Sequence, residues 1–88
     1  MADPMLHIAS AVLKARPEDQ AKVADSIAAL PGAELHGAEG GRLIVVLEAD
    51  ERAAIAGLLD QLATLDGVLS ATLVFEYAEP LGEMHEPS

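Results

Sequence analysis

The chain has 88 residues, of which 51% are hydrophobic and 2% aromatic, with no cysteine and a formal net charge of −10. A chain of this length and apolar content supports one folded domain with an aliphatic core and is not typical of a disordered protein. The lack of cysteine excludes disulfides and thiolate metal sites. The acidic balance argues against nucleic acid and anionic membrane surfaces as partners, because both require Lys and Arg.

The acidic charge favours a basic partner, which long-range attraction would bring in faster, although solubility alone is the simpler interpretation. No stretch approaches the roughly 20 apolar residues of a membrane span, so we expect no membrane insertion. The N-terminal segment MADPMLHIAS has neither the basic start nor the uninterrupted apolar run of a secretory signal. We therefore expect a cytoplasmic protein.

The first half of the chain predicts a strand over residues 6–14, after a loose tail at residues 1–5. Pro17 predicts the start of a helix, because proline there loses no helical hydrogen bond and the two acids that follow it suit the positive end of the helix dipole. The helix ends at Gly32. Its apolar face is formed at i, i+4 and i+7 spacing by Val23, Ile27 and Leu30.

The second half predicts two strands, over residues 33–37 and 42–48, joined as a hairpin by the glycine-rich turn between them. Asp50 is expected to be the N-cap of a second helix, which Gly67 ends. A fourth strand is expected over residues 68–77. The apolar stripe of the second helix consists of Ile55, Leu58, Leu59, Leu62 and Leu65.

The two halves of the chain nearly repeat one another, because each contains a strand, a helix that stops at a Leu-x-Gly sequence, and another strand. Two such units predict an α+β fold, the ferredoxin-like β-α-β-β-α-β plait. Right-handed crossovers give an antiparallel sheet in the order 4-1-3-2 with both helices on one face. We expect one domain over residues 6–78, with flexible tails at 1–5 and 79–88.

Alternation along each strand predicts which side chains face the helices and which face away. The inward sets are Ala9, Ala11 and Leu13, then Leu43, Val45 and Leu47, then Ala71, Leu73 and Phe75. The uncovered face is expected to hold Ile8, Ser10, Val12, Ile44, Val46, Glu48, Ser70, Thr72, Val74 and Glu76. An aliphatic patch on an uncovered sheet suggests a surface that binds another chain, or a dimer that buries two sheets against each other. A slip of one residue would exchange the two sets.

Two carboxylates, Glu48 and Glu76, are expected to share the uncovered face with these aliphatic side chains. Together they would hold a cationic group beside an apolar one, since a carboxylate pairs bidentately with an arginine guanidinium. The simpler alternative is that each acid is solvated at a strand end, where exposed ion pairs contribute little.

Catalytic and metal-binding patterns are absent from the sequence. The three histidines, His7, His36 and His85, are far apart and form no helical i, i+4 pair. No serine lies in a G-x-S-x-G context. The glycine-rich stretch at residues 37–41 precedes a strand and therefore lacks the helix N-terminus that a phosphate loop needs. We therefore expect that the protein is not an enzyme and that it binds neither a cofactor nor a metal.

Three segments in this order resemble the NapD family, the maturation chaperones of the periplasmic nitrate reductase. They are Leu30-Pro31-Gly32, the run GRLIVV at residues 41–46, and Gly67-Val68-Leu69 leading into residues 70–77. The resemblance covers residues 7–78. It implies a cytoplasmic chaperone that binds the twin-arginine signal peptide of the catalytic subunit, NapA, as a helix over the open sheet. The precursor would thus be held back from the Tat translocon until the molybdenum cofactor is inserted.

The family has no fixed catalytic motif, so the resemblance assigns no role to single residues. A twin-arginine peptide is basic at one end and apolar beyond it, which suits an acidic chain with an open aliphatic face. The alternative is a regulatory plait that binds a small ligand or dimerises. A stable sheet-to-sheet dimer would favour this alternative, whereas we expect a chaperone to be a monomer. A third alternative, a small enzyme such as an acylphosphatase, is disfavoured because this chain lacks a phosphate-binding loop followed by a helix.

Overall fold

The computed structural model describes residues 5–80. The predictions for residues 1–4 and 81–88, including His85, lie outside this range. The elements in chain order are β1 (Met5–Ala15), the 3-10 helix η1 (Pro17–Asp19), α1 (Gln20–Ala28), β2 (Ala33–Glu39), β3 (Arg42–Ala49), α2 (Arg52–Ala63) and β4 (Val68–Pro80).

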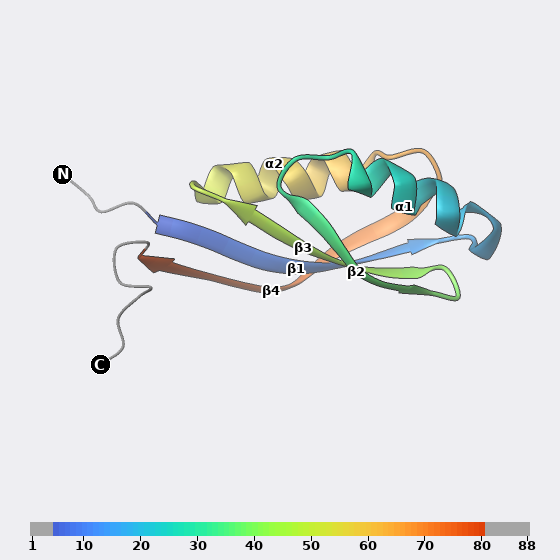
Figure 1. Cartoon of the computed structure of the whole chain (residues 1–88), viewed down its shortest axis with the longest axis horizontal. Helices are drawn as coiled ribbons and strands as arrows, with labels where there is room; N and C mark the ends of the chain where they lie inside the picture. Colours follow the sequence, from blue (N-terminus) through green and yellow to red (C-terminus); the bar gives the residue numbers. More distant parts are fainter. Residues whose placement is uncertain (1–4, 81–88) are drawn as a thin grey trace.

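The sheet has the order β2-β3-β1-β4, which is the predicted order 4-1-3-2 read from the other edge, and all three pairings are antiparallel. Both helices cover the same face, and within residues 5–80 no helix or strand covers the opposite face (Figure 1). The predicted α+β plait is therefore confirmed. β1 and β3 are the central strands, and β2 and β4 are the two edges.

The core between sheet and helices is aliphatic, as the composition predicts. The inward residues predicted on β1 and β3 are all fully buried, which confirms the alternation on these strands. Full burial of one such Val, Leu or Ile side chain stabilises the fold by about 1.5–3 kcal/mol. The buried residues are Ala9, Ala11, Leu13, Ala15, Val23, Ile27, Leu43, Val45, Leu47, Ile55, Leu58 and Leu62.

The helix starts differ in detail from the prediction. Pro17 begins a single 3-10 turn, and α1 follows it from Gln20. The prediction that Asp50 caps α2 is wrong, because the N-cap position is Glu51, in an extended conformation and with no side-chain cap hydrogen bond. The reason is that β3 continues to Ala49, which pairs with His7, so the chain turns into the helix later.

The hairpin between β2 and β3 is tighter than predicted. Glu39 and Arg42 pair directly, and the two residues between them, Gly40 and Gly41, have φ values of 63° and 85°. Positive φ at both central residues defines the two-residue turn that suits twisted hairpins, and glycine adopts it without strain. The rest of the glycine-rich segment therefore belongs to β2, which runs to Glu39.

Strand β4 has two register shifts against β1. Ser10 pairs with Phe75 and Ala11 pairs with Leu73, so that Val74 is an extra residue in the ladder. A second shift leaves Leu69 without a partner in β1, between the pairs that Lys14 and Ala15 make. Each extra residue is a bulge that reverses the alternation beyond it.

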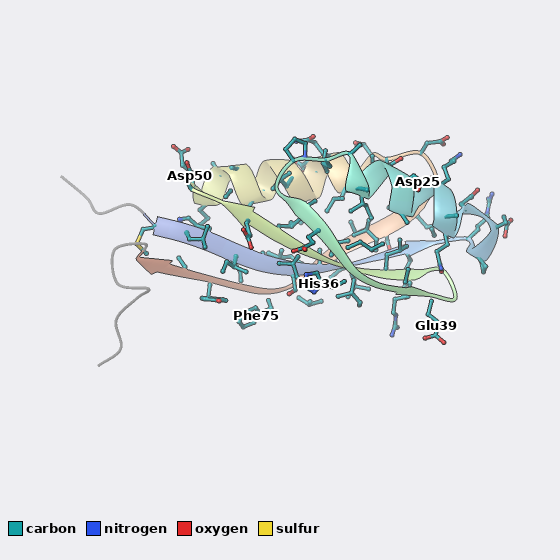
Figure 2. All side chains as sticks on the ribbon, viewed as in Figure 1. Asp25, His36, Glu39, Asp50 and Phe75 are labelled. Carbon is teal, nitrogen blue, oxygen red and sulfur yellow. The ribbon has the colours of Figure 1, made fainter. Side chains whose placement is uncertain are left out.

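The Val74 bulge overturns two predictions on β4. Phe75, expected to face the helices, lies opposite Ser10 on the open side and is 54% exposed. Figure 2 shows its side chain on the side of the sheet away from the helices. Glu76, expected on the open side, lies opposite the buried Ala9 and therefore faces the helices.

Candidate functional site: the open face of the sheet

The open face is the side of the sheet away from α1 and α2, and the strand registers align its side chains in rows that cross the strands. Successive rows from one end are Glu48–Ile8–Tyr77, Glu34–Val46–Ser10–Phe75, Gly37–Ile44–Val12–Thr72 and Glu39–Arg42–Lys14–Ser70. Three zones of different chemistry follow from these rows. Every residue predicted for the open face belongs to one of the four rows, except Glu76 and the extra residue Val74.

The apolar zone is most accessible on the edge strand β4. Among the described residues, all four exposed large hydrophobic side chains belong to this strand: Leu69 at 64%, Val74 at 57%, Phe75 at 54% and Tyr77 at 42% exposure. Ile8, Val12, Ile44 and Val46, on the two central strands, are half-buried. The apolar area available to a partner is therefore concentrated towards β4.

Phe75 and Tyr77, here called the aromatic pair, lie beside each other on β4. Their ring centroids are 5.4 Å apart and their planes are inclined by 56°. Aromatic rings in tilted contact stabilise each other, and each presents a large, stiff apolar surface. The alternation pattern placed Phe75 on the wrong face because the pattern contains no information about the bulge that precedes Phe75.

Glu34 and Glu48, here called the acidic corner, line a pocket of about 330 Å³ together with Gly32, Ala33 and Val46. Glu34 points away from the core because Ala33 and Leu35, on either side of it in β2, pack against the core. Its Oε1 lies 3.3 Å from Nε2 of His36. The sequence analysis did not join Glu34 to Glu48. The signal that was available for Glu34 is the pair of apolar residues on either side of it in β2.

Glu76 lies on the helix face, so the expected pairing of Glu48 with Glu76 is wrong. The side chain of Glu76 is 23% exposed, and its Oε2 lies 3.4 Å from Nε of Arg52 in α2. It lines a separate pocket of about 230 Å³ with His7, Arg52, Tyr77 and Ala78. The sheet separates this pocket from the acidic corner.

Lys14 and Arg42, here called the basic row, pair across β1 and β3 at the opposite end of the open face. Arg42 also pairs with Glu39 in β2. Glu48 lies six positions after Arg42 in β3, which corresponds to about 20 Å along an extended strand. One end of the open face therefore carries two cations and the carboxylate of Glu39, and the other carries Glu34 and Glu48. The formal net charge of the whole chain is −10.

Within residues 5–80, no group of three or more His, Asp or Glu side chains could hold a metal ion. No helix of the same range is long and apolar enough to cross a membrane. The features that do stand out on the open face are a broad apolar surface and separated charges. An exposed apolar surface of this kind is typical of an interaction site.

Comparison with known proteins gives consistent results. The family model described as "NapD protein" matches residues 6–80. Chaperone NapD of Paracoccus pantotrophus is 40% identical over 78 residues, which cover 89% of this chain and 70% of that protein. Chaperone NapD of Escherichia coli K12 is 31% identical over 78 residues, covering 86% of this chain and 90% of that protein.

A solved structure shares the fold. The solution structure of the E. coli Tat proofreading chaperone protein NapD superimposes with a TM-score of 0.76 and 28% sequence identity. The match covers 94% of this chain and 90% of the solved one. The curated relatives are named as chaperones and not as enzymes.

Proposed function

Since this chain belongs to the NapD family of chaperones, we propose that it binds the twin-arginine signal peptide of the NapA precursor on the open face of its sheet. The bound precursor would stay in the cytoplasm until the molybdenum cofactor is inserted. The mechanism is competition, because a signal peptide that is covered by the sheet cannot reach the translocon.

One observation carries the proposal: the helices cover only one face of the sheet, and the other presents apolar side chains beside carboxylates (Figures 1 and 2). A twin-arginine peptide has the complementary chemistry, with two guanidinium groups followed by an apolar segment. The acidic net charge of the chain favours the encounter with its basic end.

Apolar burial supplies more of the affinity than charge pairing. Covering the exposed part of Phe75 or Tyr77 removes on the order of 100 Å² from water, which contributes about 2 kcal/mol per ring. An exposed ion pair contributes about 0–1 kcal/mol. The aromatic pair and its aliphatic neighbours therefore set how tightly the peptide binds, and the acids set which peptide binds.

The proposed contact residues differ from the sequence prediction at four residues. Glu76 is removed because it faces the helices. Glu34 and the aromatic pair are added. The residues retained are Ile8, Ser10, Val12, Ile44, Val46, Glu48, Ser70, Thr72 and Val74.

The test is a titration of the isotope-labelled chain with a synthetic twin-arginine peptide from the NapA precursor, followed by amide resonance shifts. We expect shifts confined to β1, β3 and β4 and to the β2 residues beside Glu34. No binding, or shifts confined to α1 and α2, would overturn the proposal. A stable dimer that buries the open face, seen by sedimentation, would favour the regulatory plait instead.

Two substitutions probe the face directly. Val12→Glu and Val46→Glu place a charge on half-buried central positions of the open face, and we expect each to reduce peptide binding at least about tenfold while the domain stays folded. Ala28→Glu, at an exposed position of α1, is the matched control and should bind normally. Unimpaired binding by both valine variants would contradict the proposed face.

A further inference from the structure

The open face is not uniform, and its three zones lie at different corners. The acidic corner belongs to β2 and β3, the aromatic pair to β4 at the same end of the sheet, and the basic row to β1 and β3 at the far end. An elongated ligand with one charged end and one apolar end therefore has a preferred direction on this surface.

The basic row excludes arginines from the far end of the open face. Lys14 and Arg42 are both exposed and lie directly opposite each other. The same row also holds Glu39, opposite Arg42 in β2. A further cation placed there would meet two like charges against this one carboxylate, which is unfavourable across neighbouring strands. The separation of about 20 Å from Glu48 exceeds the Debye length of about 8 Å at physiological salt, so the two ends act independently.

The acidic corner accepts arginines. Its pocket of about 330 Å³ has Glu34 and Glu48 on its lining with Val46 between them in the register. A carboxylate pairs with both ends of a guanidinium fork, and the apolar side chain of Val46 offers a surface for the methylene stem of an arginine. Each of the two carboxylates in this pocket can pair with one guanidinium group.

The aromatic pair lies across the sheet from this pocket. Glu34, Val46, Ser10 and Phe75 form one row, and three strand spacings of about 4.8 Å separate its ends, which is about 14 Å. A peptide of about ten residues spans this distance even when it is helical, at 1.5 Å per residue. Along this path, the apolar residues that follow the arginines reach Phe75 and Tyr77.

We propose that the bound peptide lies across the strands, with its arginines in the acidic corner and its apolar segment over the aromatic pair. This direction rests on the proposed function, because it takes the ligand to be a peptide with a basic start and an apolar continuation. It places the N-terminal side of the peptide at the β2 edge and the C-terminal side at the β4 edge.

Paramagnetic broadening tests the direction. The chain has no cysteine, so a nitroxide attached to a single cysteine of the peptide is the only label. A label before the arginines should broaden the amides of Glu34 and Glu48, and a label after the apolar segment should broaden those of Phe75 and Tyr77. The reverse pattern, or broadening of Lys14 and Arg42 by the first label, would overturn the direction and leave the proposed function standing. A peptide that does not bind at all overturns both.

Charge neutralisation gives a second readout. Glu34→Gln combined with Glu48→Gln should weaken binding roughly 2- to 30-fold, as expected for two lost ion pairs. Glu76→Gln, on the helix face, is the matched control and should change the affinity less than twofold. Lys14→Gln combined with Arg42→Gln should leave affinity equal or higher. Equal losses for the double glutamate variant and for Glu76→Gln would contradict the acidic corner as the arginine site.

Discussion

At the scale of single residues, Gly41 joins three elements of the fold. Its amide donates a hydrogen bond to the Oε1 of Gln20 at 2.7 Å, and its carbonyl accepts one from the amide of Ala15 at 2.7 Å. These bonds tie the β2–β3 turn to the end of β1 and to the start of α1. A side chain at Gly41 would collide with the carbonyl oxygen of Ala15.

We predict that Gly41→Ala lowers the free energy of unfolding by at least about 3 kcal/mol, because a positive φ costs an L-residue about 1–2 kcal/mol and the collision with Ala15 adds to it. Gly40→Ala is the matched control: it also has a positive φ, of 63°, but its added Cβ meets no atom within 4 Å. Urea unfolding should show a loss of only about 1–2 kcal/mol there. Equal losses at both positions would show that the contact with Ala15 is unimportant.

At the scale of the elements, the bulge in β4 decides which of its side chains belong to the core. Leu73 packs against the core cluster, while Phe75, only two residues later, is 54% exposed. We predict that Leu73→Ala lowers the free energy of unfolding by about 2 kcal/mol and that Phe75→Ala changes it by less than about 0.5 kcal/mol. Chemical denaturation of the two variants measures both values. A larger loss for Phe75→Ala would mean that β4 pairs without the bulge.

Strand β4 is also the strand on which the sequence failed to predict which side chains face away from the helices. Alternation placed Val12, Ile44 and Val46 towards the open face and Leu13, Val45 and Leu47 in the core, because β1 and β3 pair without interruption. On β4 the residues on both sides of Val74 are apolar, so either register suits the pattern and nothing in the sequence marks the extra residue. The errors at Phe75 and Glu76 follow from that one position.

Glu34 shows a different limit of sequence reasoning. Its outward direction follows from the alternation of β2, but its neighbourhood to Glu48 depends on the pairing of β2 with β3, which brings Glu34 opposite Val46. The order of the strands was predictable from the repeated strand–helix–strand pattern. The sequence could not predict which side chains become neighbours across β2 and β3, because a shift between Leu35 and Gly37 changes the pairing register.

One ion pair links α1 to the loop before β4. Nζ of Lys22 donates a hydrogen bond to Oδ2 of Asp66 at 2.7 Å. This hydrogen bond and the charge attraction raise the pKa of Lys22 above 10.5 and lower the pKa of Asp66 below 3.8. Both side chains are exposed, so the pair adds little stability at neutral pH.

The sign of the pH dependence follows from these pKa directions. The contribution of Asp66 is present above the ordinary carboxyl pKa of 3.8 and is lost as the pH falls through its lowered folded value. That of Lys22 is present below 10.5 and is lost as the pH rises through its raised value. We predict that Asp66→Asn slightly lowers the melting temperature at pH 7 and not at pH 2. A deficit that persists at pH 2 would mean that Asp66 acts by other contacts.

At the scale of the whole molecule, the net charge of −10 would attract a basic partner over long distances. We predict that the association rate constant with a twin-arginine peptide falls at least about tenfold between 0.05 and 0.5 M salt, while the dissociation rate changes much less. The reason is that steering acts over long distances that salt screens, whereas the proposed apolar contacts with Phe75 and Tyr77 are insensitive to salt. Stopped-flow measurements separate the two rates. A salt effect confined to dissociation would contradict charge steering.

The register shifts at Leu69 and Val74 have a consequence for self-association. β4 is an edge strand of 13 residues, and all four exposed large hydrophobic side chains of the described residues lie on it. A straight edge of this kind would be a template on which further copies of the chain add strand by strand into an aggregate. Bulges break the even spacing of backbone donors and acceptors that such growth needs. The irregularities that turn the rings outward thus also protect the molecule from polymerising through them.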